Sequence, residues 1–199
     1  MKEVTGNPLF PVFLQLNKLH VLLVGGGNVG LEKLTALLGN SPKATVTLVA
    51  REISTDVRSY VADYPAVRLR ERAFEEADLD GVDLVVVASN NPQLNAHIRN
   101  ECRKRHLLIN VADKPDLCDF YLGSVVKKGN LKLGISTNGK SPTIAKRIKE
   151  LLNDALPDEI DETLTYMSQL RDLLKGDFND KVKALNAHTA SLLASKEGI

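Results

Sequence analysis

The stretch VLLVGGGNVG, Val21 to Gly30, places three consecutive glycines between an apolar run and a segment with helical spacing. Gly25, Gly27 and Gly30 fit the pattern G-x-G-x-x-G. Where this pattern joins a strand to a helix, the first glycine permits a tight turn and the second lets a pyrophosphate approach the backbone. The third lets helix and strand pack closely, and the helix N-terminus faces the anion. The stretch predicts a dinucleotide site, and the alternative is a strand–helix turn without a ligand.

Short runs rich in Val, Leu and Ile alternate with helical segments on both sides of the glycines, through residue 112. Most runs lack strict polar alternation, which is expected of a parallel sheet covered on both faces. The strands predicted in this way are His20–Val24, Thr45–Val49, Val67–Glu71, Asp83–Ala88 and Leu107–Val111. One helix between them should begin at Asn91-Pro92, with the asparagine as N-cap. The alternation predicts an α/β fold with a Rossmann-type, doubly wound parallel sheet.

The pattern changes after Asp113. The segment FYLGSVVKKGNLKLGIST predicts two strands joined by Lys128-Gly129-Asn130, a β-hairpin. A helix should follow, with Ser141 as N-cap and Pro142 in its first position. Its apolar stripe consists of Ile144, Ile148, Leu151 and Leu152.

Two more helices are expected, over Asp158–Leu174 and Asp177–Ala194. We therefore expect three parts in the chain. Residues 1–113 form a dinucleotide-binding domain, residues 114–140 carry the hairpin, and residues 141–199 form a small C-terminal helical domain.

Composition excludes several classes of protein. Of the 199 residues, 43% are hydrophobic and 26% charged, so a sizeable core can form and disorder is not expected. A net charge of +1 argues against general nucleic-acid binding. No apolar run approaches the ~18 residues of a membrane span, and no signal-peptide core is visible. Cys102 and Cys118 form no CxxC pair and the histidines have no ligand spacing, so we expect reduced thiols, no metal site and a cytoplasmic location.

Polar residues follow the predicted strands at the edge where a parallel sheet binds ligands. The candidate dinucleotide contacts there are Gly25, Gly27, Asn28, Val29, Gly30, Arg51, Glu52, Ser89 and Asn90. An acidic residue after the second strand is typical of NAD sites, whereas an arginine accommodates the phosphate of NADP. Arg51 precedes Glu52 here, so the expected cofactor is NAD, with NADP left open.

Three stretches resemble one family, precorrin-2 dehydrogenase, the N-terminal module of siroheme synthase. They are LFPVFLQLNKLHVLLVGGGNVGLEKLTALL, VVVASNNPQLN and INVADKPDLCDFYLGSVVKKGNLKLGISTNGKSPTIAKRIKE. The similarity is dense from Pro8 to Leu152. It implies oxidation of precorrin-2 to sirohydrochlorin with NAD⁺ in siroheme biosynthesis, and an intertwined homodimer formed by the segment after the Rossmann domain, with the hairpin near Phe120–Ser136 at its interface.

The resemblance also points to residues for catalysis and substrate binding. Asp113 matches an aspartate regarded in this family as important for dehydrogenation, although a turn residue before Lys114-Pro115 is the plain alternative. Precorrin-2 carries many carboxylates, and the segment from Tyr121 through Lys149 has seven basic residues and no acidic one. The candidate substrate contacts in this segment are Lys140, Ser141 and Arg147. Its alternatives are a solvated surface or a match for the acidic C-terminal tail of a partner subunit.

Two other functions stay open at this point. Some members of the family also insert iron, so a bifunctional dehydrogenase and ferrochelatase is an alternative. A Rossmann module that senses nucleotides and regulates another protein is an alternative of a different class, because a fold does not fix a function. The residues alone leave undecided whether iron is inserted, whether Asp113 is a base or a positioning group, and what the last two helices do.

Overall fold

Packing divides the chain into two units. The computed structural model describes residues 6–174, 180–183 and 186–187. One unit comprises Leu9–Leu122, and the other contains the residues before Leu9 together with those from Gly123 onward. The hairpin therefore belongs with the helix that follows it, while the functional division into three segments stays a prediction. The helix expected over Asp177–Ala194 lies mostly outside the described residues.

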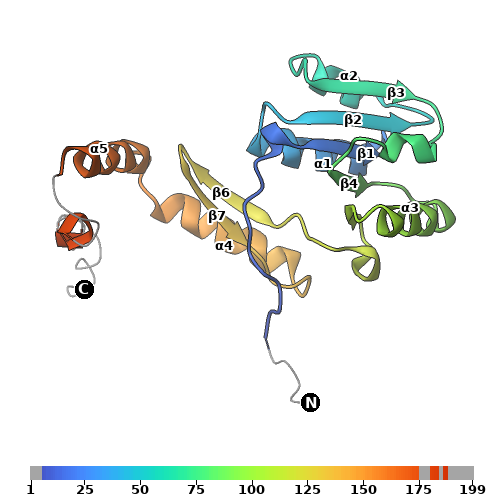
Figure 1. Ribbon diagram of the computed structural model, residues 1–199. Helices are drawn as coiled ribbons and strands as arrows, with labels where there is room; N and C mark the ends of the chain where they lie inside the picture. The colour runs from blue at the N-terminus through green and yellow to red at the C-terminus, as the bar shows by residue number, and fades with distance from the viewer. Residues whose placement is uncertain (1–5, 175–179, 184–185, 188–199) are drawn as a thin grey trace. The chain divides into compact units, whose positions relative to one another are not determined.

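The first unit contains a five-stranded sheet in the order β3-β2-β1-β4-β5, with all neighbouring strands parallel (Figure 1). The strands are β1 (His20–Val24), β2 (Thr45–Ala50), β3 (Val67–Glu71), β4 (Leu84–Val87) and β5 (Leu108–Val111). In the register, Val21 lies between Val46 of β2 and Leu84 of β4. The predicted doubly wound sheet is confirmed, with each strand within one or two residues of its expected bounds.

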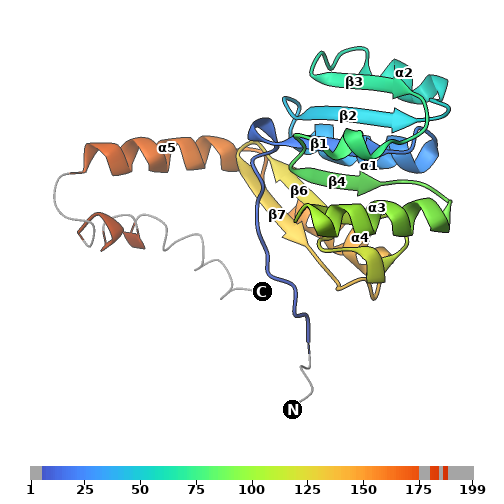
Figure 2. The same ribbon diagram turned by 45° about the vertical axis from the view of Figure 1, so that its right-hand side comes forward.

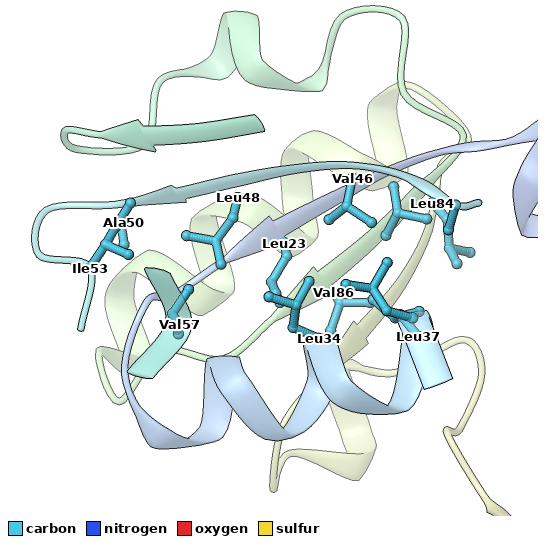
Figure 3. Packing of buried hydrophobic residues seen from close by; sticks show 13 residues of the cluster. Leu23, Leu34, Leu37, Val46, Leu48, Ala50, Ile53, Val57, Leu84 and Val86 are labelled. Atoms are coloured by element: carbon cyan, nitrogen blue, oxygen red, sulfur yellow. The ribbon is translucent and has the colours of Figure 1, made fainter. Parts of the chain in front are cut away.

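Alternate residues of the central strands contribute to two separate cores. Val21 and Leu23 of β1 face α1 (Asn28–Asn40) and α2 (Thr55–Val61), where Leu34 and Val57 are fully buried (Figure 3). The other residues of β1 face α3 (Pro92–Lys104) and the short 3₁₀ helix η2 (Glu76–Leu79). Because both faces of β1 are covered by apolar side chains, its sequence shows no polar alternation.

The helices of this unit begin where their caps predict. The Asn91 side chain accepts a hydrogen bond from the Leu94 N–H, and Pro92 occupies the first turn of α3. Ser54 caps α2 in the same way by accepting from the Val57 N–H. No helix among the described residues is long and apolar enough to cross a membrane.

The second unit is built on the hairpin of β6 (Ser124–Lys128) and β7 (Leu131–Ile135), which pair antiparallel as predicted (Figure 2). The helix α4 (Pro142–Ala155) packs against both strands and buries Val126 against Ala145. A further helix, α5 (Ile160–Leu173), begins near the hairpin turn, where the Asn130 N–H and side-chain amide both donate to Asp161. Phe120 and Leu122, expected on the hairpin, pack instead against the core of the sheet unit.

An ion pair fixes the segment that follows β5. Both guanidinium nitrogens of Arg99, on α3, donate to the Asp119 carboxylate at 2.5 and 2.8 Å. Asp119 also accepts the Ile109 N–H at 3.1 Å, next to the 3₁₀ helix η3 (Pro115–Leu117). Bidentate pairs of this kind combine charge with fixed geometry. This contact closes the loop that begins at the end of β5.

Replacing Asp119 with Ala should lower the free energy of unfolding by about 2 kcal/mol, because three hydrogen bonds to a charged, half-buried group are lost. Urea denaturation measures the change. Asp116→Ala is the control, since this exposed carboxylate lies in η3 three residues away. Equal stability of the two variants would show that the ion pair contributes nothing to the loop.

Candidate dinucleotide site

The topology of the sheet defines where a ligand belongs. The chain order reverses between β1 and β4, because β2 and β3 lie on one side of β1 and β4 and β5 on the other. In open α/β sheets, ligands bind in the crevice at the carboxyl ends of the strands at this switch point. The glycine stretch follows β1 there, so its geometry decides whether the crevice is open.

Gly25 and Gly30 meet demands of the protein itself. Gly25 has φ +126°, and a Cβ there would lie 2.2 Å from the Ala88 carbonyl oxygen. A Cβ on Gly30 would lie 2.3 Å from the Gly25 carbonyl oxygen. Only glycine tolerates such approaches, so these two positions bring the start of α1 against the ends of β1 and β4.

Gly27 is different, because nothing in the chain requires a glycine there. Its backbone is extended (φ −93°), and a Cβ would have no atom within 4 Å. Gly27 is the N-cap of α1, and no side chain caps the helix. The first amides of a helix have no intrahelical acceptor and carry a partial positive charge. The open space above Gly27 is therefore suited to an anion such as a pyrophosphate.

Gly26, which lies outside the expected contacts, joins the glycine stretch to the loop after β2. Its carbonyl accepts the Ser54 N–H at 2.9 Å, and a Cβ there would lie 2.6 Å from the Glu52 carbonyl oxygen. The side chains of Arg51 and Glu52 are exposed beside this contact. The third consecutive glycine was the signal in the sequence for such a close approach.

A pocket of about 200 Å³ lies at the ends of β4 and β5. It brings together four of the predicted site residues, Val29, Ser89, Asn90 and Asp113. The other lining residues are Ala88, Pro92, Asn95, Ala112 and Lys114. Asn95 was not predicted, although it is buried and its amide Nδ2 donates to the Ser89 carbonyl at 2.9 Å.

Asp113 occupies a strained turn at the mouth of β5. Its φ is +57°, and the turn is closed by the Lys114 N–H, which donates to the Val111 carbonyl at 3.2 Å. Aspartate and asparagine adopt this left-handed conformation more readily than other non-glycine residues. Strain of this kind persists where the surrounding structure enforces it and is frequent at functional sites. The carboxylate is exposed at the pocket.

The three candidate substrate contacts belong to the second unit. The Ser141 hydroxyl accepts the Ile144 N–H at 3.1 Å and caps α4, as predicted. Lys140 is exposed in the preceding turn, and Arg147 contacts Glu150 at 3.2 Å.

Acidic residues beyond the basic segment balance part of its charge. Lys128 pairs with Asp158, and this hydrogen bond lowers the pKa of the Asp158 carboxyl. Together with the contact between Arg147 and Glu150, this pair means that at least two of the seven basic residues have an acidic neighbour within their own unit.

One group of side chains in the described part of the chain has the spacing of metal ligands. The ligand atoms of Glu76, His97 and Glu101 lie within 4.8 Å of one another. Both carboxylate oxygens of Glu101 are already bonded at 2.5 Å, to Lys104 and to Arg105, and these bonds lower the pKa of the Glu101 carboxyl. The group therefore has a structural explanation as an ion-pair network.

The glycines separate stability from ligand space. Gly25→Ala should lower the free energy of unfolding by about 2–3 kcal/mol, because alanine is strained at positive φ and meets the Ala88 carbonyl. Gly27→Ala should change it by less than about 1 kcal/mol, the range of an N-cap effect. Thermal and urea denaturation of both variants test the contrast, and equal losses would refute it.

The comparisons with known proteins agree with this geometry. Residues 12–124 match a family model described as NAD(P)-binding, and residues 128–155 match the central region of sirohaem biosynthesis proteins. The siroheme synthases of Pseudoalteromonas atlantica and Pseudomonas fluorescens are 31% and 33% identical over 87% and 85% of the chain. The chain spans only 37% and 36% of their lengths.

A solved structure of SirC, a precorrin-2 dehydrogenase, superposes on this chain with a TM-score of 0.74 and 26% identity. The match covers 94% of both chains, so the similarity includes the hairpin unit as well as the sheet. The family model alone accounts for more than half of the 199 residues. The chain therefore belongs to the NAD(P)-binding family of sirohaem biosynthesis proteins.

Proposed function

We propose that the chain oxidises precorrin-2 to sirohydrochlorin with NAD⁺. The observation that carries the proposal is the open backbone at Gly27, at the N-terminus of α1, beside a pocket that contains Asp113. The likeness to SirC supports the choice of substrate, because it extends over nearly the whole of both chains. A regulatory module would need the nucleotide site alone and would not require a carboxylate in a strained turn at its edge.

The crevice offers a place for each part of the dinucleotide. The pyrophosphate would lie over Gly27 and the free amides of α1. The adenosine ribose would lie by Arg51 and Glu52 after β2, which leaves the nicotinamide for the pocket between β4 and β5. NAD⁺, when bound, accepts the hydride that the oxidation releases. Glu52 suits the hydroxyls of NAD, and a preference for NADP would assign the pocket to Arg51 instead.

Asp113 would serve the second product of the oxidation, the proton. A carboxylate at the mouth of the pocket can accept that proton from the tetrapyrrole or hold the substrate in place. Both roles need the negative charge, and neither depends on a contact of the Asp113 side chain within the fold. The left-handed turn keeps the carboxylate at the pocket, because the Lys114–Val111 hydrogen bond fixes the backbone.

Asp113→Asn should lower kcat by about 10²–10⁴-fold, the usual cost of losing a general base. NAD⁺ affinity and melting temperature should stay close to wild type, because asparagine also tolerates the left-handed turn. Steady-state kinetics and thermal denaturation provide the measurements, with Asp116→Asn as the matched control. Turnover near that of wild type would reduce Asp113 to a turn residue, while loss of tetrapyrrole binding would assign it to positioning.

The basic segment would bind the carboxylates of the tetrapyrrole. Lys140 is exposed immediately before the N-terminus of α4, whose free amides also favour anions. Arg147 lies two turns further along the same helix, and its guanidinium is 77% exposed despite the contact with Glu150. An exposed ion pair is weak, so a polycarboxylate ligand can compete for this arginine.

Reversing Lys140 and Arg147 together to Glu should raise the KM for precorrin-2 and weaken the dependence of KM on salt, since fewer charges contact the polyanion. NAD⁺ affinity should not change. The double reversal of Lys43 and Arg68 alters net charge equally in the sheet unit and is the control. If both double variants behave alike, the basic segment is an ordinary solvated surface.

We also propose that two copies of the chain associate through the second unit. The outward stripe of α4 leaves Ile144, Ile148 and Leu151 exposed at 52%, 37% and 66%. The opposite side of α4 covers the hairpin, so the apolar strands alone do not require a partner. A second copy that covers this stripe would remove apolar surface from water at about 25 cal/mol per Å².

Light scattering at micromolar concentration should give the mass of a dimer for the wild type. Leu151→Lys should shift the mass toward the monomer, because it places a charge in the apolar stripe. Leu108→Lys, at a residue that is 50% exposed on β5, should leave the dimer intact. A monomeric wild type would refute this part of the proposal.

A further inference from the structure

Asn95 carries a buried hydrogen-bond acceptor that the fold leaves without a donor. It lies in the second turn of α3, is 1% exposed and lines the pocket at the ends of β4 and β5. Its Oδ1 is the single buried side-chain oxygen or nitrogen without a hydrogen-bond partner among the residues that the structure describes. Buried polar groups of this kind are rare and call for an explanation.

The orientation of the amide follows from its other contact. Nδ2 donates to the Ser89 carbonyl at 2.9 Å, and a flipped amide would place Oδ1 against that carbonyl, acceptor against acceptor. The unpartnered atom is therefore the oxygen, and what it lacks is an N–H or O–H donor. The nearby Asn91 N–H is already bonded to the Ser89 hydroxyl at 3.1 Å.

The surroundings of Asn95 indicate which ligand group supplies this donor. The pocket also contains the Asp113 carboxylate, a second acceptor, so it suits a group with more than one donor. At about 200 Å³ it is smaller than the ~300–1,000 Å³ of sites that enclose a whole ligand, so it takes one part of the molecule. The carboxamide of a nicotinamide ring offers two N–H donors on a small planar group.

We propose that Asn95 binds the cofactor, with its Oδ1 accepting a hydrogen bond from the nicotinamide carboxamide. This inference rests on the proposed function, which places the nicotinamide between β4 and β5. The oxygen is covered in the unliganded chain, so binding has to move the side chains over it far enough to admit one donor. In exchange, an acceptor that is unsatisfied without ligand gains its partner, and the ring is oriented at the pocket that holds Asp113.

The test compares ligands that differ at the carboxamide. NAD⁺, 3-acetylpyridine adenine dinucleotide and ADP-ribose are titrated calorimetrically into the wild type and Asn95→Leu. The acetylpyridine analogue has a methyl group in place of the amide NH₂. The wild type should bind NAD⁺ roughly tenfold more tightly than the analogue, the ratio for one hydrogen bond. Asn95→Leu should abolish that ratio and leave ADP-ribose affinity within about twofold of the wild type.

The remaining outcomes overturn the inference in distinguishable ways. If Asn95→Leu weakens all three ligands equally, Asn95 only shapes the Ser89 turn. If the wild type does not distinguish NAD⁺ from the analogue, the oxygen does not contact the carboxamide. If the wild type binds none of the three ligands, the proposed function itself fails. Asn95→Ser, a smaller change, takes the place of the leucine variant if that variant does not fold, and the same ratios apply.

Discussion

The close approach of Gly25 to the Ala88 carbonyl is the constraint on which the rest of the structure depends. It brings the end of β1 against the end of β4, the two strands between which the chain order reverses. Gly30 then approaches the Gly25 carbonyl and sets the direction of α1. With these backbones in contact, no side chain can fill the crevice at its narrowest point. The helix N-terminus is consequently left facing open space.

The site follows from this constraint by two separate routes. One is backbone geometry, which presents the free amides at Gly27 and the left-handed turn at Asp113 without the help of any side-chain partner. The other is the ordering of loops by hydrogen bonds and an ion pair. Asn95 holds the Ser89 turn, and Arg99 holds Asp119 beyond the loop of Asp113. The chemistry proposed for the site therefore needs few residues that touch the ligand and many that fix the backbone around it.

Much of this could be predicted from sequence, because the determining interactions are local. The glycine spacing, the caps of α3 and α4 and the five apolar strands each reflect contacts within a few residues. Asn95 could not be predicted as a pocket residue, since only the packing of α3 on the sheet buries it. The pairing of Lys128 with Asp158 spans 30 residues of sequence and was equally invisible. Phe120 and Leu122 resembled hairpin residues because apolar alternation does not reveal which of two cores a side chain joins.

The central claim is that an open glycine backbone holds NAD⁺ for the oxidation of a tetrapyrrole. Its most direct test is to mix the purified wild type with precorrin-2 and NAD⁺, following the absorbance of NADH and of sirohydrochlorin together. The account predicts that both products appear in equal amounts, and that Gly27→Val, a folded variant with its phosphate space filled, forms neither. Wild-type protein that binds NAD⁺ yet leaves precorrin-2 unchanged, or a valine variant as active as wild type, would contradict it.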